Sequence, residues 1–347
     1  MSTMPGEQIR RDDILRAFPV AARSKDVLEA AVLDAAFDVL LREMHTQGLF
    51  EEFSVVFKGG TALRKLRFGH KGRFSFDLDF DVEPGSEEII AEEVDGFASA
   101  GFFFEVAERR GHRHLRIASG LLPDGAYDVK LDFSHRGHWL GPDHLRPVAS
   151  PALPTAIWDL QAAVPTMKLE ENIAEKLSRW QTRRLVRDLH DIAAAWRLID
   201  DTELVAELYV LKSHRNWSAM LPSRRPPQAA MPLAETTAAT KPSHFALDDL
   251  VHPTIHTRAE KLHKIQADLE IAATATSTID RHIADSPLQE LALDTGRLAW
   301  KATQRIEALQ DAHNIQTADP LALGPLSSDL ESRLPDPTTR QAPGLDL

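Results

Sequence analysis

VFKGGTALRKLRFGHKGRFSFDLDFDV, residues 56–82, combines three patterns in one short segment. A buried-looking apolar run leads into a glycine pair, a segment with only cationic charges follows, and aspartates then occupy every second position. Alternation from residue 74 predicts a strand with one apolar and one polar face. The apolar face would carry Phe74, Phe76, Leu78, Phe80 and Val82; the polar face would carry Ser75, Asp77, Asp79, Asp81 and Glu83.

The flanking sequence predicts an α+β fold in which a small mixed sheet with helices is followed by a helical domain. Residues 53–57, 102–109, 113–119 and 127–135 have strand patterns, whereas residues 86–100 and most of the chain after 167 have helical ones. The expected organisation is a helical lead-in (1–50), a sheet domain (51–155), a helical domain (156–315) with a proline-rich connection (222–253), and a disordered tail (316–347). Two late helices are expected at about 256–283 and 287–312.

Composition narrows the class of protein. The chain has 347 residues, enough for two domains, and lacks cysteine, which excludes disulfides and thiolate metal sites. We find no apolar run long enough to span a bilayer and no secretory signal, so a cytoplasmic protein without membrane attachment is the simplest interpretation. A net charge of −12 argues against coating nucleic acid through bulk charge, but it leaves room for a local basic patch in the loop after the glycines.

The aspartates of the alternating strand are candidate metal ligands. Asp77 and Asp79 share a face about 6.5–7 Å apart, and Mg²⁺ prefers oxygen ligands together with water and substrate phosphate. Two such ions would clamp the attacking and leaving oxygens of a phosphoryl displacement. Asp132, on the strand candidate YDVKLDF, is the expected third ligand, and Asp128 is the fallback. The alternative is a polar outer strand face, although three adjacent carboxylates repel one another unless a cation neutralises them.

The segment KGGT, Lys58 to Thr61, is a candidate phosphate site. Glycines between a strand and a helix let backbone N–H groups approach a ligand, and the helix N-terminus has a partial positive charge. Lys58 adds a charge and Thr61 a hydroxyl. The spacing is not that of a Walker loop, and a tight turn without a ligand remains the alternative.

A helical segment after residue 169 presents a third set of candidates. Asn172, Lys176, Arg179 and Arg183 recur at helical spacing, so one face carries an amide and three cations that could hold a triphosphate or an RNA backbone. Asp188 and Asp191 could pair with the arginines or orient Lys176. The alternative is an ordinary solvated face that pairs with Glu171 and Glu175.

In combination these motifs resemble a known family. FKGGTALRK, RFSFDLDF, KLDF, ENIAEKLSRW and RRLVRDLHDI occur in the order found in the AbiEii-type nucleotidyltransferase toxins of type IV toxin–antitoxin and abortive-infection systems. That family is part of the polymerase-β-like nucleotidyltransferase superfamily. The resemblance covers about residues 25–200.

The resemblance implies an enzyme that uses an NTP and Mg²⁺, with one or two ions, to transfer a nucleotide to RNA, in studied relatives the tRNA 3′ end. Carried over by motif, Lys58, Gly59, Gly60 and Thr61 hold the triphosphate, Asp77, Asp79 and Asp132 hold metal, and Lys176 contacts the nucleotide. Asp188 completes the site, but the motif has His190 where an aromatic often precedes the second aspartate, so Asp188 and Asp191 are both candidates. Asn172 and Arg179, on the same helical face, join the nucleotide-binding candidates.

Ser75 matches a serine that, in some relatives, a partner antitoxin phosphorylates, so the resemblance implies a cognate antitoxin protein as partner. Two other functions compete with RNA modification. One is nucleotide transfer to a small molecule or a protein hydroxyl, and the other is an inactive nucleotide-binding module, against which the intact Asp77, Asp79 and Lys176 argue.

Overall fold

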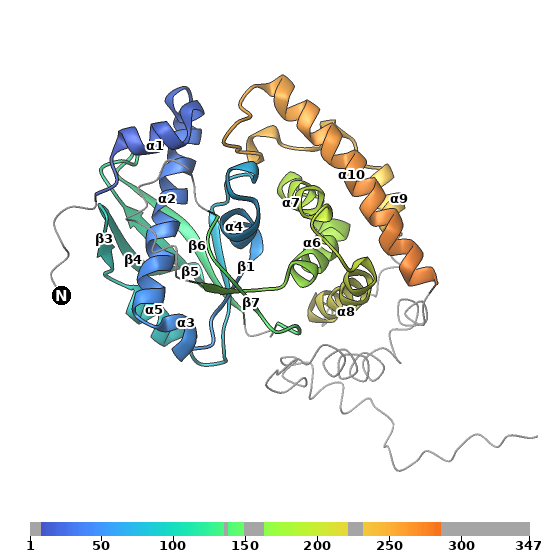
Figure 1. The fold of residues 1–347 in the computed structure, drawn as a ribbon, viewed down its shortest axis with the longest axis horizontal. Helices are drawn as coiled ribbons and strands as arrows, with labels where there is room; N and C mark the ends of the chain where they lie inside the picture. Colours follow the sequence, from blue (N-terminus) through green and yellow to red (C-terminus); the bar gives the residue numbers. More distant parts are fainter. Residues whose placement is uncertain (1–7, 135–137, 149–162, 221–231, 286–347) are drawn as a thin grey trace, which may run out of the picture.

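The computed structural model describes residues 8–134, 138–148, 163–220 and 232–285. It has two parts: a mixed sheet with N-terminal helices, and a group of helices beside it (Figure 1). The α+β class is therefore confirmed. The expected helix at 287–312 and the expected tail at 316–347 lie outside the described residues.

The first part begins with helices that pack on the sheet. They are α1 (Arg11–Ala17), a 3-10 turn (Pro19–Ala22), α2 (Lys25–Thr46) and α3 (Leu49–Glu52). Ser24 caps α2 by accepting a hydrogen bond from the Val27 amide, 3.4 Å away. Almost every residue of α2 between Val27 and Leu41 is buried, because the sheet, α1 and the glycine turn surround it.

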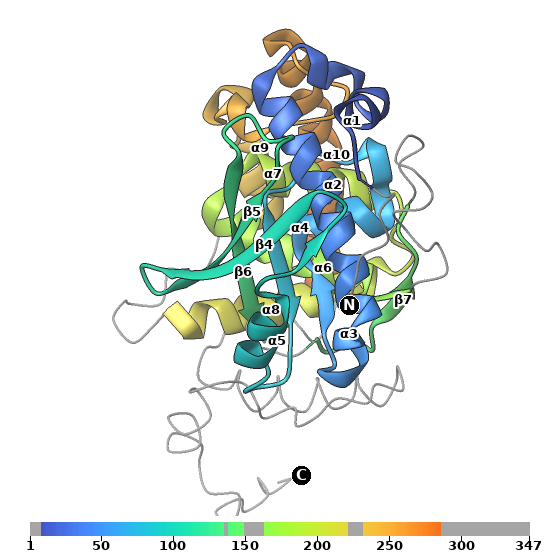
Figure 2. The same cartoon turned by 90° about the vertical axis from the view of Figure 1, so that its left-hand side faces the viewer.

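The sheet has eight strands in the order β3-β4-β5-β6-β2-β1-β8-β7. The bounds are β1 (Val56–Lys58), β2 (Asp77–Asp81), β3 (Ala98–Ser99), β4 (Phe102–Arg109), β5 (His112–Ala118), β6 (Ala126–Ser134), β7 (Asp143–Leu145) and β8 (Val164–Thr166). The pairs β2–β6 and β1–β8 are parallel, and the other neighbours are antiparallel. α5 (Glu87–Val94) packs against β4, and the β4–β5 hairpin extends beyond the helices (Figure 2).

The alternation in β2 has the predicted consequence for its two faces. Leu78 and Phe80 are buried in the core that α2 shares with the sheet, and Phe80 stacks on Phe57 of β1 and on Phe133 of β6. The strand is shorter than residues 74–82, because the Phe74 amide donates to the Val251 carbonyl at 2.8 Å instead of to a neighbouring strand. Because side chains alternate along the strand, Asp77 and Asp79 lie on the face opposite Leu78 and Phe80, toward the helical part.

Helical turns follow β1: α4 (Gly59–Ala62), a π-type turn (Leu63–Phe68) and a 3-10 turn (Gly69–Lys71). The sequence left room for a local basic patch in this loop, but two of its cations are buried in ion pairs. Arg64 is buried and donates to Asp34 of α2 and to the carbonyls of Gly69 and Gly72. Lys65 is also buried and pairs with Asp34 (3.0 Å) and Asp38 (2.9 Å), so these cations anchor the loop to α2.

The second part consists of α6 (Leu169–Arg183), α7 (Val186–Trp196), α8 (Thr202–Met220), α9 (Leu233–Ala238) and α10 (Arg258–Ala284). They surround a separate hydrophobic cluster that includes the fully buried Trp180. α10 packs against α7, α8 and α9, and it confirms the helix expected at about 256–283 (Figure 1). Within the connection 222–253, the described part contains α9 and two 3-10 turns, Pro242–His244 and Leu247–Asp249.

Candidate active site

Asp77 and Asp79 lie at the centre of the sheet, on the face toward α6 and α7. In the strand register Asp79 is opposite Lys58 of β1 and opposite Asp132 of β6, while Asp77 is opposite Lys130. Register partners point to the same side of a sheet, so these charged side chains form one group. Neighbouring strands thus bring together carboxylates that are far apart in the sequence, as predicted.

The glycine turn packs directly against Asp79. Gly59 has φ +76°, and a Cβ atom there would lie 2.1 Å from Asp79 Oδ2. A Cβ on Gly60 would lie 2.5 Å from Arg73 Nη2. Thr61 donates its hydroxyl to the Asp77 carbonyl. Gly59 is therefore required by its positive φ and by the close approach of Asp79, whereas a side chain at Gly60 would displace the Arg73 guanidinium. The turn holds the start of α4 against the two aspartates.

The environment of Asp79 disfavours its charged form. Burial raises the pKa of Asp79 above its usual value, and the neighbouring Asp77 adds to this effect. Arg179, Lys176 and Lys58 oppose the increase but do not cancel it. An additional cation at this carboxylate would therefore stabilise the ionised form, which is what a metal ligand requires.

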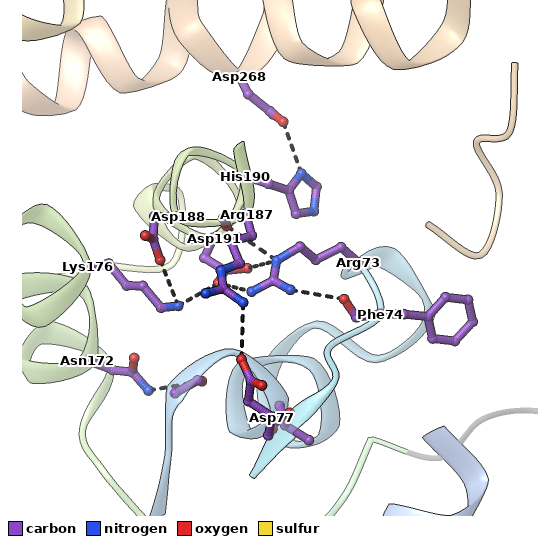
Figure 3. Close-up of polar contacts among 12 residues, drawn as sticks. Arg73, Phe74, Asp77, Asn172, Lys176, Arg187, Asp188, His190, Asp191 and Asp268 are labelled. Atoms are coloured by element: carbon purple, nitrogen blue, oxygen red, sulfur yellow. Dashed lines mark hydrogen bonds and ion pairs between the residues drawn. The ribbon is translucent and has the colours of Figure 1, made fainter. Parts of the chain in front are cut away.

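Lys176 is the centre of a buried ionic network between α6 and α7 (Figure 3). Its ammonium lies 3.1 Å from Asp188 Oδ1 and 2.9 Å from Asp191 Oδ2. Burial alone would lower the pKa of Lys176, but Asp191 and Asp188 outweigh it and raise the pKa above its usual value. Lys176 is consequently a fixed cation near neutral pH and is unsuited to act as a proton acceptor.

Arg73 joins this network to the sheet (Figure 3). Its guanidinium donates twice to Asp191, at 3.0 and 2.7 Å, and also to the Phe74 carbonyl at 3.0 Å. Burial alone would raise the pKa of Asp191, but Arg73 and Lys176 hold it well below its usual value. Asp191 is thus bound by two cations from different parts of the fold, whereas the contact of Asp188 shown in Figure 3 is with Lys176.

Arg187 is a site residue that the sequence patterns missed. Its Nη1 donates to Asp77 Oδ2 at 3.1 Å, so a cation from α7 reaches one of the two central carboxylates (Figure 3). The row of cations counted along α6 ends at Arg183, which is exposed. Arg187 comes four residues after Arg183, in the first turn of α7. It directly precedes the candidate Asp188, and this position next to a site residue is the signal that could have identified it.

On the other side of the turn, Lys58 is connected to α6 and α8. Its ammonium is buried, 3.5 Å from Glu175, and Lys212 lies 3.0 Å from Glu175 and 2.6 Å from Glu171. The pKa of Glu175 is well below its usual value because Lys212 and Lys58 outweigh the effect of burial. Glu171 and Glu175 are thus structural anchors and do not form the solvated face considered as an alternative.

The remaining candidates have different surroundings. Asn172 is buried and donates to the Gly59 carbonyl at 3.5 Å, and Arg179 lies among Glu175, Asp79, Asp188 and Asp132, which together keep its pKa above the usual value although burial opposes this. Ser75 is only 8% exposed, before the first residue of β2. Its Oγ lies 3.1 Å from the place that a Cβ on Gly60 would take.

Asp132 stands beside Asp79 in register, but its carboxylate is 48% exposed and contacts Lys130 Nζ at 2.7 Å. Within the described residues, no three histidine or acidic side chains gather closely enough to hold a metal ion. Asp77 and Asp79 do fit Mg²⁺, because this ion is typically bound by one or two carboxylates and completed by water and substrate phosphate. Among the described helices, none is long and apolar enough to cross a membrane.

Comparison with known proteins identifies the family and the fold. The family model for the nucleotidyl transferase AbiEii toxin of the type IV toxin–antitoxin system matches residues 38–300. The solved structure of MenT4, a nucleotidyltransferase toxin from Mycobacterium tuberculosis H37Rv, is similar with a TM-score of 0.65 and 27% identity. The similarity covers 87% of this chain and 99% of that chain. No curated protein matches the sequence.

Proposed function

This chain belongs to the AbiEii nucleotidyltransferase toxins of type IV toxin–antitoxin systems, and from that premise we propose that it transfers a nucleotide from an NTP to RNA in a Mg²⁺-dependent reaction. The proposed acceptor is the tRNA 3′ end. The observation that carries the proposal is the pair Asp77 and Asp79, packed against the Gly59–Thr61 turn and faced by Lys176 of the helical part.

Asp77 and Asp79 would hold Mg²⁺, and Asp132 would add a third carboxylate from the neighbouring strand. A bound ion supplies charge to the transferring phosphoryl group and activates the attacking hydroxyl. Burial and the charge of Asp77 raise the pKa of Asp79, so a bound cation would stabilise the ionised form of this carboxylate. Arg187 lies on the same Asp77 carboxylate and neutralises part of its charge.

The triphosphate would lie between the glycine turn and α6. Gly59, Gly60 and Thr61 present the start of α4, and Lys176 and Arg179 approach from the opposite wall. Lys58 would be held in place by its ion pair with Glu175, and Asn172 would hold the turn by its hydrogen bond to the Gly59 carbonyl. Ser75 would pack against the turn beside Gly60. Fixed cations and backbone N–H groups need no reorganisation when phosphate charge develops, which is the main source of catalysis in phosphoryl transfer.

Asp188 and Asp191 would both orient Lys176. Asp191 is the anchor of the two, since Arg73 binds it as well and ties it to the sheet. Asp188 contacts Lys176, and its negative charge also helps to keep the pKa of Arg179 above the usual value, so that Asp188 would stabilise both cations of the site.

The decisive test is incorporation of label. Purified protein is incubated with Mg²⁺, total RNA and each α-labelled NTP in turn, and the RNA is separated by electrophoresis. We expect label in the tRNA band, and none with Asp77→Asn or Asp79→Asn at equal protein concentration. Label in a small molecule or in protein would favour the competing transferase, and no label with any NTP or acceptor would favour an inactive nucleotide-binding module.

Toxicity provides a cellular test. Expression of the chain alone should stop bacterial growth, because tRNA with an altered 3′ end cannot be used in the cytoplasm for translation. Asp77→Ala should restore growth, and immunoblotting must show that the variant accumulates to the wild-type level. Co-expression of the cognate antitoxin should restore growth of the wild type as well.

A further inference from the structure

Strands β4, β5 and β6 have a polar face that is continuous with the candidate active site. Across the sheet, Asp77 is opposite Lys130 of β6, Lys130 is opposite His114 of β5, and His114 is opposite Ala107 of β4. All four side chains therefore point to the side of Asp77. The other side of the same strands carries buried residues such as Leu115 and Val129, which belong to the core.

We propose that this face binds the RNA acceptor and guides its 3′ end to Asp77 and Asp79. The inference rests on the proposed function, and it adds the surface by which the substrate is recognised. The surface is defined by Phe103 and Arg109 of β4, Arg116 of β5 and Lys130 of β6. Residues at alternate positions of one strand, and register partners on the next, place all four on this side.

The exposure of these side chains shows that the face is open. The Arg109 and Arg116 side chains are 49% and 44% exposed, and Phe103 is 46% exposed although it is a large apolar residue. Figure 2 shows the tip of the β4–β5 hairpin extending beyond the neighbouring helices. The surface is thus accessible at one side of a site whose phosphate-binding end is buried.

The charges on the face favour a polyanion. Two arginines share one carboxylate: Arg109 pairs with Asp128, and Arg116 lies 3.9 Å from the same residue. Glu105 is opposite Arg116, and Asp132 of β6 pairs with Lys130 at 2.7 Å, so three carboxylates lie on this side. With Arg110 at the exposed turn, four cations accompany these three carboxylates, so the face has a local excess of positive charge in a chain whose net charge is −12.

The exposed aromatic ring indicates nucleic acid in particular. Unpaired RNA is recognised by stacking of bases on aromatic side chains together with backbone contacts from arginine and lysine. Phe103 and Arg109 are six residues apart on one strand, which spans about 20 Å. This length suits a few nucleotides of single strand next to a helical stem.

The test measures RNA binding apart from catalysis. The probe is a 5′-fluorescein RNA hairpin with a four-nucleotide single-stranded 3′ tail, and anisotropy is followed over a range of salt concentrations. For Arg109→Gln/Arg116→Gln we expect the slope of log K against log salt to decrease in magnitude by about 1.4, that is about 0.7 for each lost phosphate contact. Phe103→Ala should weaken binding about tenfold through the lost stacking. The KM for the NTP should be unchanged in both.

The matched control is Arg113→Gln. Arg113 lies in the same hairpin, but it points to the other side, where it is 16% exposed, pairs with Glu88 at 3.1 Å and lies over the Phe133 ring. The control removes one arginine charge and should leave RNA affinity unchanged even if the melting temperature falls.

Wild-type RNA affinity and salt slope in the double variant would overturn the inference, and so would the absence of measurable probe binding by the wild type. Loss of neutralisation by a protein partner with unchanged RNA affinity would also overturn it, since the face would then bind protein. Failure of the proposed function has a different signature: RNA binds in the manner described, but no nucleotide is transferred.

Discussion

Replacement of Arg73 by methionine should lower the free energy of unfolding, because it removes the ion pair that joins the sheet to the helical part. Arg73 and Asp191 are both buried and share two hydrogen bonds of 3.0 and 2.7 Å. Removal of one partner from a buried pair typically costs about 3–5 kcal/mol, because the other charge is left uncompensated. Asp191 keeps Lys176 at 2.9 Å, so we expect a loss near the lower end, about 3 kcal/mol.

The assay is urea unfolding followed by tryptophan fluorescence, for Arg73→Met, Asp191→Asn and the double variant. Because both residues contribute to the same pair, the double variant should be more stable than the sum of the single effects implies, by about 2 kcal/mol. A single-variant cost below about 1 kcal/mol, the value of a surface pair, would refute the reasoning, as would additivity within about 0.5 kcal/mol.

The same pair predicts a pH dependence. The pKa of Asp191 is lower in the folded protein than in the unfolded chain, so its contribution to stability is fully present above the unfolded value, about 3.9, and is lost as the pH falls through the folded value. The stability difference between wild type and Asp191→Asn should therefore be constant from pH 5 to 8 and decrease below about pH 4.

Three further predictions concern the site. Asp79→Asn should abolish transfer while the metal-free melting temperature stays the same or rises, since the raised pKa of Asp79 means that its charge destabilises the fold. The stability gained by the variant should disappear as the pH falls through that pKa, because Asp79 of the wild type is then neutral as well. A marked loss of metal-free stability would instead mean that Asp79 has a structural role. Lys176→Ala should impair NTP use far more than Arg184→Ala, an exposed position at the end of α6, and equal small effects would contradict a role in the site. Ser75→Ala should remain active in the labelling assay yet escape an antitoxin that acts by phosphorylation, because a phosphate beside Gly60 would add about −1.5 to −2 charge where the triphosphate is proposed to bind. Silencing of Ser75→Ala by the antitoxin would show control by another route, and an inactive but folded Ser75→Ala would make the hydroxyl a substrate contact.

Patterns with a short period predicted the elements that matter most for the site. The period of two assigned Asp77 and Asp79 to one face because alternate residues of a strand can have no other arrangement. The helical pattern around Lys176 was equally informative, since α6 and α7 are joined by a short turn that brings Asp188 and Asp191 back to Lys176. In both cases local geometry determines which side chains meet.

Pairing between distant segments was not predictable in this way. The burial of the cations after the glycines could not be predicted, because their partners are far away in sequence: Arg64 binds Asp34, and Arg73 binds Asp191. Short strands were missed for a different reason. β7 and β8 have three residues each, which is too short for a periodic pattern to predict a strand. They form because they can pair with the edge of an existing sheet.

The gradient of burial across the site has a consequence for kinetics. Lys58, Thr61 and Lys176 are buried, whereas Asp132 and Lys130 at the opposite side are 48% and 40% exposed. A nucleotide at the glycine turn would thus lie behind an acceptor that approaches over β6. We expect compulsory order, with NTP first and acceptor second, and inhibition by excess acceptor that bound too early and obstructs entry.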